Sequence, residues 1–415
     1  MSQNDAITLL ALTLGAFIMP MLAERIGWFS APCEMLYGII VANLIPGMHF
    51  QGPFISTLSQ FGFLLLLFLV GLEIDFEALR KQGTGSLFAA TLAALGIQAG
   101  AFAMALLLHL PIIYALILGA LSVTVLMAIL HESDMVREPF GQRLLIVGAL
   151  GEFFAILALT AYDLISRYGL NWQLGVAAGK LLALLVLGYV GLRGLMALVN
   201  TQSGAVRRLL ALRDTSELGV RAALALMLVF AATALILRVE AILATFIAGA
   251  ICSFAFRGRN YVTEKLTTMG QGFFLPIFFI TVGAQVRFVD LMTPAALALL
   301  VALTVGLFGV RLAAIPLLRL AGIRWRMALP AALMLSAPLS LMVAIAQVGS
   351  SLGVLAPATV AAVLGASIVS ATLYPLLARP FLMHHIRRAQ ARTAPLPLRL
   401  DPAALAASGI DEASA

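Results

Sequence analysis

Glu152 is the residue whose position most strongly indicates chemistry. It lies about twelve residues into the apolar segment 140–165, in the run LGEFF. A helix rises about 1.5 Å per residue, so this carboxyl group is expected near the middle of a ~30 Å hydrocarbon layer. Burial disfavours an unpaired charge, so the group is stable either when protonated or when ionised with a cation bound. A group that holds a proton or Na⁺/K⁺, but not both, is the minimal machinery of antiport; a purely packing Glu is the alternative.

Arg311 is the second charged residue deep within an apolar segment. A guanidinium at that depth needs a partner, and either Glu152 or the carbonyl end of a broken helix is expected to face it. Because Arg does not readily lose its proton, we expect it to support the site without carrying a proton. A purely structural pair is the alternative.

Two apolar segments each contain polar or helix-breaking residues. These are Ser122 and Thr124 in segment 111–131, and Ser336, Pro338 and Ser340 in segment 325–348. Pro338 removes one backbone donor, and irregular backbone in a membrane survives only where it lines a cavity or is buried in protein. The pattern predicts two interrupted helices that meet at a binding site. Hydroxyl groups bonded to their own helices are the alternative.

Glu73 and Asp75 end another apolar segment, 54–74, and are followed by Arg80 and Lys81. Acidic and basic residues side by side at the end of a span are typical of the membrane interface. We therefore expect an interfacial cap there, with an ion entrance as the alternative.

The elements that must position these residues are membrane helices. The chain of 415 residues is 62% hydrophobic and only 11% charged, whereas soluble domains carry about 25% charged residues. Thirteen apolar segments are predicted, and the first is expected to be a permanent helix instead of a cleaved signal peptide. They are residues 6–23, 33–48, 54–74, 84–109, 111–131, 140–165, 173–199, 216–237, 240–256, 268–286, 291–318, 325–348 and 354–378.

The distribution of positive charge predicts the orientation. Of the 26 Lys and Arg residues, most fall in alternate connectors and in the tail. Positive residues accumulate on the cytoplasmic side, so the C-terminus is expected in the cytoplasm and the N-terminus outside the inner (plasma) membrane. Residues 381–415 are expected to form a short flexible cytoplasmic tail. The same distribution argues against a nucleic-acid partner, and no nucleotide-binding or zinc motif indicates a cofactor or an enzyme.

An internal repeat is also present. The pattern V-G-x-x-x-x-F occurs at residues 70–76 and again at 282–288, and Leu-Ser pairs occur at 121–122 and 335–336. Both matches are seven segments apart. Because seven is odd, the two copies cross the membrane in opposite directions, which predicts an inverted repeat of the kind found in secondary transporters.

Three runs resemble the Na⁺/H⁺ exchanger membrane-domain family, and most closely its monovalent cation:proton antiporter 2 branch. They are LFLVGLEID (67–75), FLPIFFITVG (274–283) and MLSAPLSL (334–341), and the resemblance covers about residues 6–380. It implies an all-α membrane fold of about 13 helices with inverted repeats and two crossed discontinuous helices. It also implies a homodimer, in which a core of residues 54–166 and 268–380 moves as an elevator against dimerisation helices before and between these ranges.

The resemblance also assigns site residues. It puts Glu152 at the position of an essential aspartate, Gly151 at a preceding Asn, Asp or Gln, and Arg311 at a paired basic residue. Ser122 and Thr124 match polar positions of the first crossed helix.

The departures from the family pattern lead to a more specific expectation. Glu replaces Asp, and Gly151 supplies no side-chain ligand, so a site with one titratable carboxylate is predicted. One cation would then exchange for one proton without net charge movement. A sodium-coupled symporter of organic anions and a transporter-like sensor that moves nothing are the alternatives.

Overall fold

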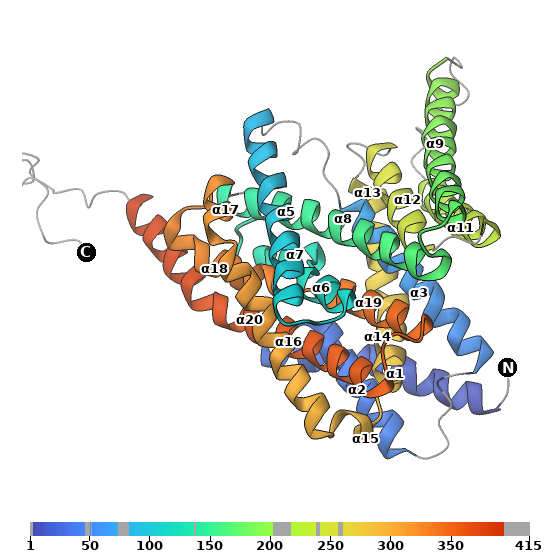
Figure 1. The fold of residues 1–415 in the computed structure, drawn as a ribbon, viewed down its shortest axis with the longest axis horizontal. Helices are drawn as coiled ribbons and strands as arrows, with labels where there is room; N and C mark the ends of the chain where they lie inside the picture. The colour runs from blue at the N-terminus through green and yellow to red at the C-terminus, as the bar shows by residue number, and fades with distance from the viewer. Residues whose placement is uncertain are drawn as a thin grey trace, which may run out of the picture.

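The chain folds into helices in the computed structural model, and the described part of the chain contains no strand (Figure 1). The structure describes residues 3–45, 50, 52–73, 83–136, 138–201, 217–237, 241–255 and 260–393. Helices satisfy their own backbone hydrogen bonds, which is why long apolar runs in a lipid environment fold in this way.

The first half of the chain forms eight described helices. They are α1 (Gln3–Ile26), α2 (Ser30–Leu44), α3 (Pro53–Leu72), α5 (Thr84–Leu107), α6 (Ile112–Gly119), α7 (Val123–Glu132), α8 (Pro139–Tyr168) and α9 (Trp172–Thr201).

The second half continues with ten α-helices and one π-helical turn. They are α11 (Leu218–Ile236), α12 (Ala241–Ala255), α13 (Asn260–Met269), the π-helical turn η1 (Gly270–Phe274), α14 (Leu275–Ala284), α15 (Phe288–Leu291), α16 (Pro294–Ala313), α17 (Ile315–Leu320), α18 (Trp325–Leu335), α19 (Leu339–Ser351) and α20 (Pro357–Thr393).

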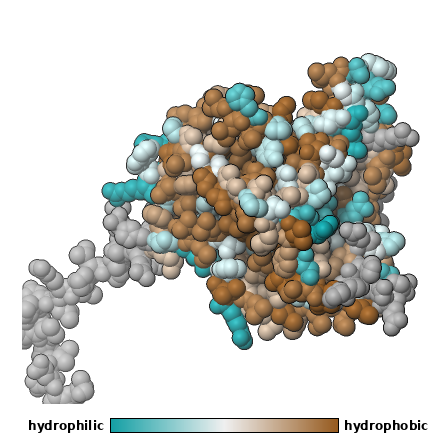
Figure 2. Space-filling view, turned by 60° about the horizontal axis from the view of Figure 1, so that its bottom comes forward, coloured by the Kyte–Doolittle hydropathy of each residue, from teal (hydrophilic) through white to brown (hydrophobic). Residues whose placement is uncertain are grey.

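Each of the thirteen predicted apolar segments corresponds to one helix or to a run of consecutive helices. Within the described ranges, ten helical stretches are long and apolar enough to cross a membrane, and Trp172–Leu184 and Ala241–Phe254 are shorter apolar helices. One face of the molecule carries broad apolar areas interrupted by smaller polar patches (Figure 2). A membrane protein is therefore confirmed, while the number of thirteen crossings stays a prediction.

The V-G motifs of the repeat mark two equivalent helix crossings. A Cβ atom on Gly71 of α3 would lie 1.9 Å from the carbonyl oxygen of Phe246 in α12. A Cβ atom on Gly283 of α14 would likewise lie 2.1 Å from the carbonyl oxygen of Met35 in α2. Both helix pairs are in backbone contact at these points, and only glycine permits so close an approach.

The partner helices α12 and α2 contribute glycines of their own to the same two crossings. A Cβ atom on Gly249 of α12 would lie 1.9 Å from the oxygen of Phe68, and one on Gly38 of α2 would lie 2.0 Å from the oxygen of Ile280. The pairs α3–α12 and α2–α14 also pack more extensively than any other described pair of helices. The predicted repeat is thus present in the structure and includes α2 and α12 as well, while the opposite direction of its two copies stays a prediction.

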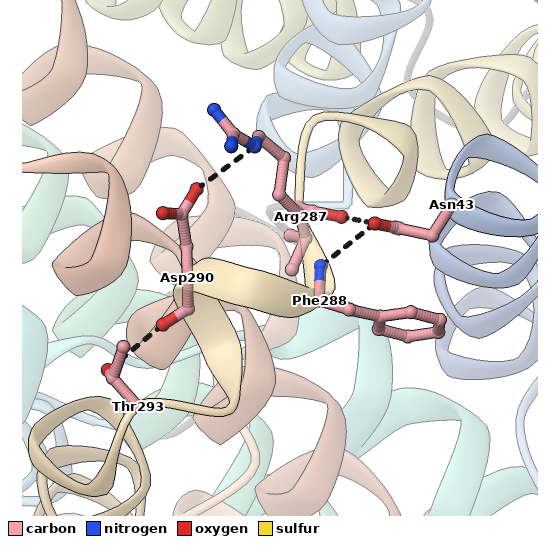
Figure 3. A network of polar contacts seen from close by, with 6 residues as sticks. Asn43, Arg287, Phe288, Asp290 and Thr293 are labelled. Carbon is pink, nitrogen blue, oxygen red and sulfur yellow. Dashed lines mark hydrogen bonds and ion pairs between the residues drawn. The ribbon is translucent and has the colours of Figure 1, made fainter.

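Asn43 joins the end of α2 to the turn after α14 (Figure 3). Its amide nitrogen donates to the oxygen of Val286 at 2.8 Å, and its oxygen accepts from the backbone N–H of Phe288 at 2.8 Å. Arg287 and Asp290 form an ion pair at 3.7 Å across the short helix α15. This turn leads directly to α16, the helix that carries Arg311.

Both predicted interruptions are present. Segment 111–131 is divided into α6 and α7 by residues 120–122, and segment 325–348 is divided into α18 and α19 by residues 336–338. These two pairs lie in the middle of the fold, with α5 and α8 packed against α6 and α20 packed against α19 (Figure 1).

Candidate ion-binding site

The two helix interruptions meet through a pair of serines. The Oγ atoms of Ser122 and Ser340 are 2.9 Å apart and both residues are buried. Pro338 occupies the N-cap position of α19, so its lack of an N–H group removes no helical bond. Ser336 behaves differently, because its hydroxyl donates to the oxygen of Ala332 in its own helix at 2.7 Å. Ser122, Ser340 and Pro338 therefore shape the crossing, and Ser336 follows the structural alternative.

Glu152 lies at this crossing and is 2% exposed. Its Oε2 atom accepts the backbone N–H of Val123, the first residue of α7, at 2.7 Å. The first N–H groups of a helix have no intrahelical partners and carry partial positive charge. The N-terminus of α7 therefore stabilises the ionised form of this carboxyl group, and no cationic side chain among the described residues forms an ion pair with it.

Arg311 is fully buried and caps the other half-helix. Its guanidinium donates to the carbonyl oxygens of Leu118 and Ala120 at the end of α6, and to that of Leu307 in its own helix at 2.9 Å. The described residues contain no ion pair between Arg311 and Glu152. Of the two expected partners, the carbonyl end of a broken helix is the one observed. Arg311 thus compensates the negative end of the α6 dipole.

Glu73 enters the site although the sequence suggested an interfacial position. It is the C-cap residue of α3. Together with Glu152 it lines a cavity of about 10 Å³, completed by Val70, Val123, Ala149 and Phe246. That volume suffices for about one water-sized particle. The expectation of a single carboxylate is therefore wrong, because the cavity has two; Asp75, Arg80 and Lys81 lie outside the described residues.

Two buried oxygen atoms, Oε2 of Glu73 and Oγ1 of Thr124, make no hydrogen bond of standard geometry. The Thr124 hydroxyl lies within reach of the Glu73 carboxyl group and can donate to it. Buried oxygen atoms normally have partners, so each exception requires an explanation. The geometry allows one such explanation, in which these two oxygen atoms and Glu152 coordinate a cation.

Gly151 is explained by packing. A Cβ atom there would lie 2.1 Å from the Cδ1 atom of Leu121, which belongs to the interruption between α6 and α7. The side chain of Leu121 therefore occupies the space that an Asn, Asp or Gln at position 151 would need. No group of three or more His, Cys, Asp or Glu side chains suited to a resident metal occurs in the described ranges.

Comparisons with known proteins identify the family of the chain. Residues 13–384 match the family described as sodium/hydrogen exchanger, transmembrane. A putative Na⁺/H⁺ antiporter, YjbQ, of Bacillus subtilis is 26% identical over 404 residues, which cover 91% of this chain and 63% of the relative. A probable Na⁺/H⁺ antiporter of Methanocaldococcus jannaschii is 24% identical over 373 residues, covering 88% of this chain and 93% of the relative.

A solved structure shows the same fold. The sodium proton antiporter MjNhaP1 of Methanocaldococcus jannaschii superimposes with a TM-score of 0.61 at 16% identity, covering 92% of this chain and 98% of the other. The family match spans most of the sequence, including both interrupted helices and Glu152. The chain therefore belongs to the sodium/hydrogen exchanger transmembrane family.

Proposed function

We propose that this protein exchanges Na⁺ or K⁺ for H⁺ across the inner membrane by alternating access, with Glu152 as the shared binding group. The observation that carries the proposal is the double role of Glu152, which caps α7 and lines a cavity of about 10 Å³. The relatives named as Na⁺/H⁺ antiporters support the choice of ions.

Competition between the two ions follows from the small volume of the cavity. A cation bound there needs the ionised carboxylate, because its charge must be compensated in a region without water. A proton on Glu152 removes that charge and occupies an oxygen atom that the cation would contact. Each ion therefore leaves before the other binds, which is the condition for exchange.

The one-for-one exchange is proposed from the pair of carboxylates. Two carboxylates in one small buried cavity resist simultaneous ionisation. A single monovalent cation compensates one negative charge, so Glu73 keeps its proton while Glu152 exchanges. One proton then leaves for each cation that enters, and no net charge crosses the membrane.

The moving parts are proposed from the membership of the chain in the sodium/hydrogen exchanger family. Residues 54–166 and 268–380 form the core that carries the site, and the remaining helices form the dimerisation domain of a homodimer. The N-terminus lies outside and the C-terminus in the cytoplasm, as the distribution of Lys and Arg indicates.

Everted membrane vesicles test the proposal. After respiration acidifies the lumen, addition of Na⁺, K⁺ or Li⁺ should restore the fluorescence of a pH-sensitive dye. Because one proton competes with one cation, a plot of the logarithm of the apparent KM against pH should have a slope of about −1. A slope near −2 would contradict the one-for-one exchange, and no response to any of the three cations from mildly acidic to alkaline pH would contradict antiport itself.

A further inference from the structure

The interruption between α6 and α7 leaves three consecutive carbonyl oxygens in need of donors, those of residues 118–120. Arg311 donates to the first and the third. The middle one, Gly119, accepts from the Nε2 atom of Gln98 in α5 at 3.0 Å. With no water available, buried carbonyl groups need such donors from the protein itself. Gln98 therefore completes the cap that Arg311 leaves open.

Gln98 also reaches the helix that carries the ion-binding carboxylate. Its Nε2 atom donates a second hydrogen bond, at 3.1 Å, to the oxygen of Gly151, the residue directly before Glu152. The side chain is 7% exposed. One amide group thus joins the interrupted helix to α8 next to the proposed binding group.

The chemistry of the site favours an amide at this position. Both contacts are carbonyl oxygens, so the side chain must offer two N–H donors. A cationic side chain would compete with the transported cation for Glu152, and a carboxylate would have no N–H to offer. The approach is also close, because a Cβ atom on Gly119 would lie 2.3 Å from the Oε1 atom of Gln98.

We propose that Gln98 is a positioning residue that holds Glu152 in register with the N-terminus of α7 and thereby sets the affinity for the transported cation. This inference rests on the proposed function. A cation needs several oxygen atoms at fixed positions, whereas a proton needs only one. Loss of the Gln98 hydrogen bonds therefore weakens cation binding more than proton binding. The rate at which the ion-loaded site moves across the membrane should change less than either affinity.

The test compares Gln98→Met, which keeps the side-chain length and removes both donors, with the wild type in everted vesicles. Loss of a group that holds a cation ligand in position changes affinity by roughly 10–100-fold. We therefore expect the apparent KM for the cation to rise about tenfold or more, with little change in the maximal rate. Two charged groups are unchanged in this variant: Glu73, which lines the same cavity as Glu152, and Arg311, which donates to the end of α6.

Thr160→Val is the matched control. Thr160 is also buried, and its hydroxyl bonds only to Ile156 of its own helix α8, at 2.9 Å. This variant should keep the wild-type KM. If Gln98→Met does not yield folded protein, Gln98→Asn replaces it, because Asn keeps the donors on a shorter side chain; its KM should also rise. Cation-dependent thermal stabilisation of the purified protein gives a binding readout that does not depend on transport.

The outcomes separate the two proposals. Wild-type exchange together with an unchanged KM in the Gln98 variants would overturn the positioning role and leave the antiport proposal intact. A lower maximal rate with an unchanged KM would also overturn it, since that result indicates a structural role only. Absence of exchange in the wild type would instead contradict the proposed function.

Discussion

The backbone N–H of Val123 donates to the Oε2 atom of Glu152 at 2.7 Å, so the carboxylate acts as a cap for the half-helix α7. This bond ties the charge state of Glu152 to the interruption in the helix. The same interruption is held by Arg311 at the end of α6 and by the Ser122–Ser340 contact with α19. The site is thus built from helix ends, and the side chains of α8 and α16 complete them.

Substitution of the crossing glycines should destabilise the fold. Gly71→Ala places a methyl group against the backbone of α12, and Gly283→Ala does the same against α2. Overpacking of this kind costs about 1–3 kcal/mol, so thermal unfolding of the purified protein should occur at lower temperature. Gly175→Ala is the control, because no atom lies within 4 Å of the added group. Equal melting temperatures for all three variants would contradict this prediction, because the helices at each crossing could then move apart without loss of stability.

Arg311→Met should be strongly destabilising. The substitution leaves the oxygens of Leu118 and Ala120 buried without donors, and each unsatisfied group costs about 1–3 kcal/mol. We expect a large loss of folded protein in size-exclusion profiles of detergent extracts. Arg287→Gln serves as the control, since that side chain is 71% exposed and its ion pair is at the surface. A normal profile for Arg311→Met would show that the cap is dispensable.

Much of this site was predictable because a charge in an apolar segment is conspicuous. Glu152 and Arg311 interrupt long apolar runs, and Pro338 with the serines marks the breaks. The partner of Arg311 was not predictable, because Leu118 is 193 positions away in the sequence and two physically reasonable partners were available. Only the packing of α16 against α6 decides between them.

The sequence predicted an interfacial position for Glu73 because this residue ends an apolar segment next to basic residues. The repeat offered a usable signal. In the two V-G motifs Glu73 corresponds to the neutral Gln285, so one half of the repeat carries an acid that the other half lacks. Such asymmetry within a symmetric scaffold favours a function over a packing role. Gln98 is a single amide within an apolar helix, and its contacts with Gly119 and Gly151 depend on tertiary packing.

Glu73→Gln should keep exchange active. The amide imitates the protonated carboxyl group that the proposal assigns to Glu73, so the protein still moves one proton for each cation. The amide also keeps one carbonyl oxygen for the cation, so any change in the apparent affinity should be less than about tenfold. Cation titrations in vesicles with the membrane potential held at zero measure this change. The assignment fails if Glu73→Gln abolishes exchange, or if wild-type exchange responds to an imposed potential while the variant does not.

The most direct test of the central claim is cation-dependent dye recovery in everted vesicles carrying Glu152→Gln. The amide keeps the size of the side chain but exchanges no proton and carries no charge, so recovery should disappear for every cation that the wild type transports. Glu264→Gln, which changes an exposed carboxylate of α13, should behave like the wild type at equal protein levels. Retained cation-dependent recovery in Glu152→Gln would contradict the account, because the shared binding group would then have to lie elsewhere.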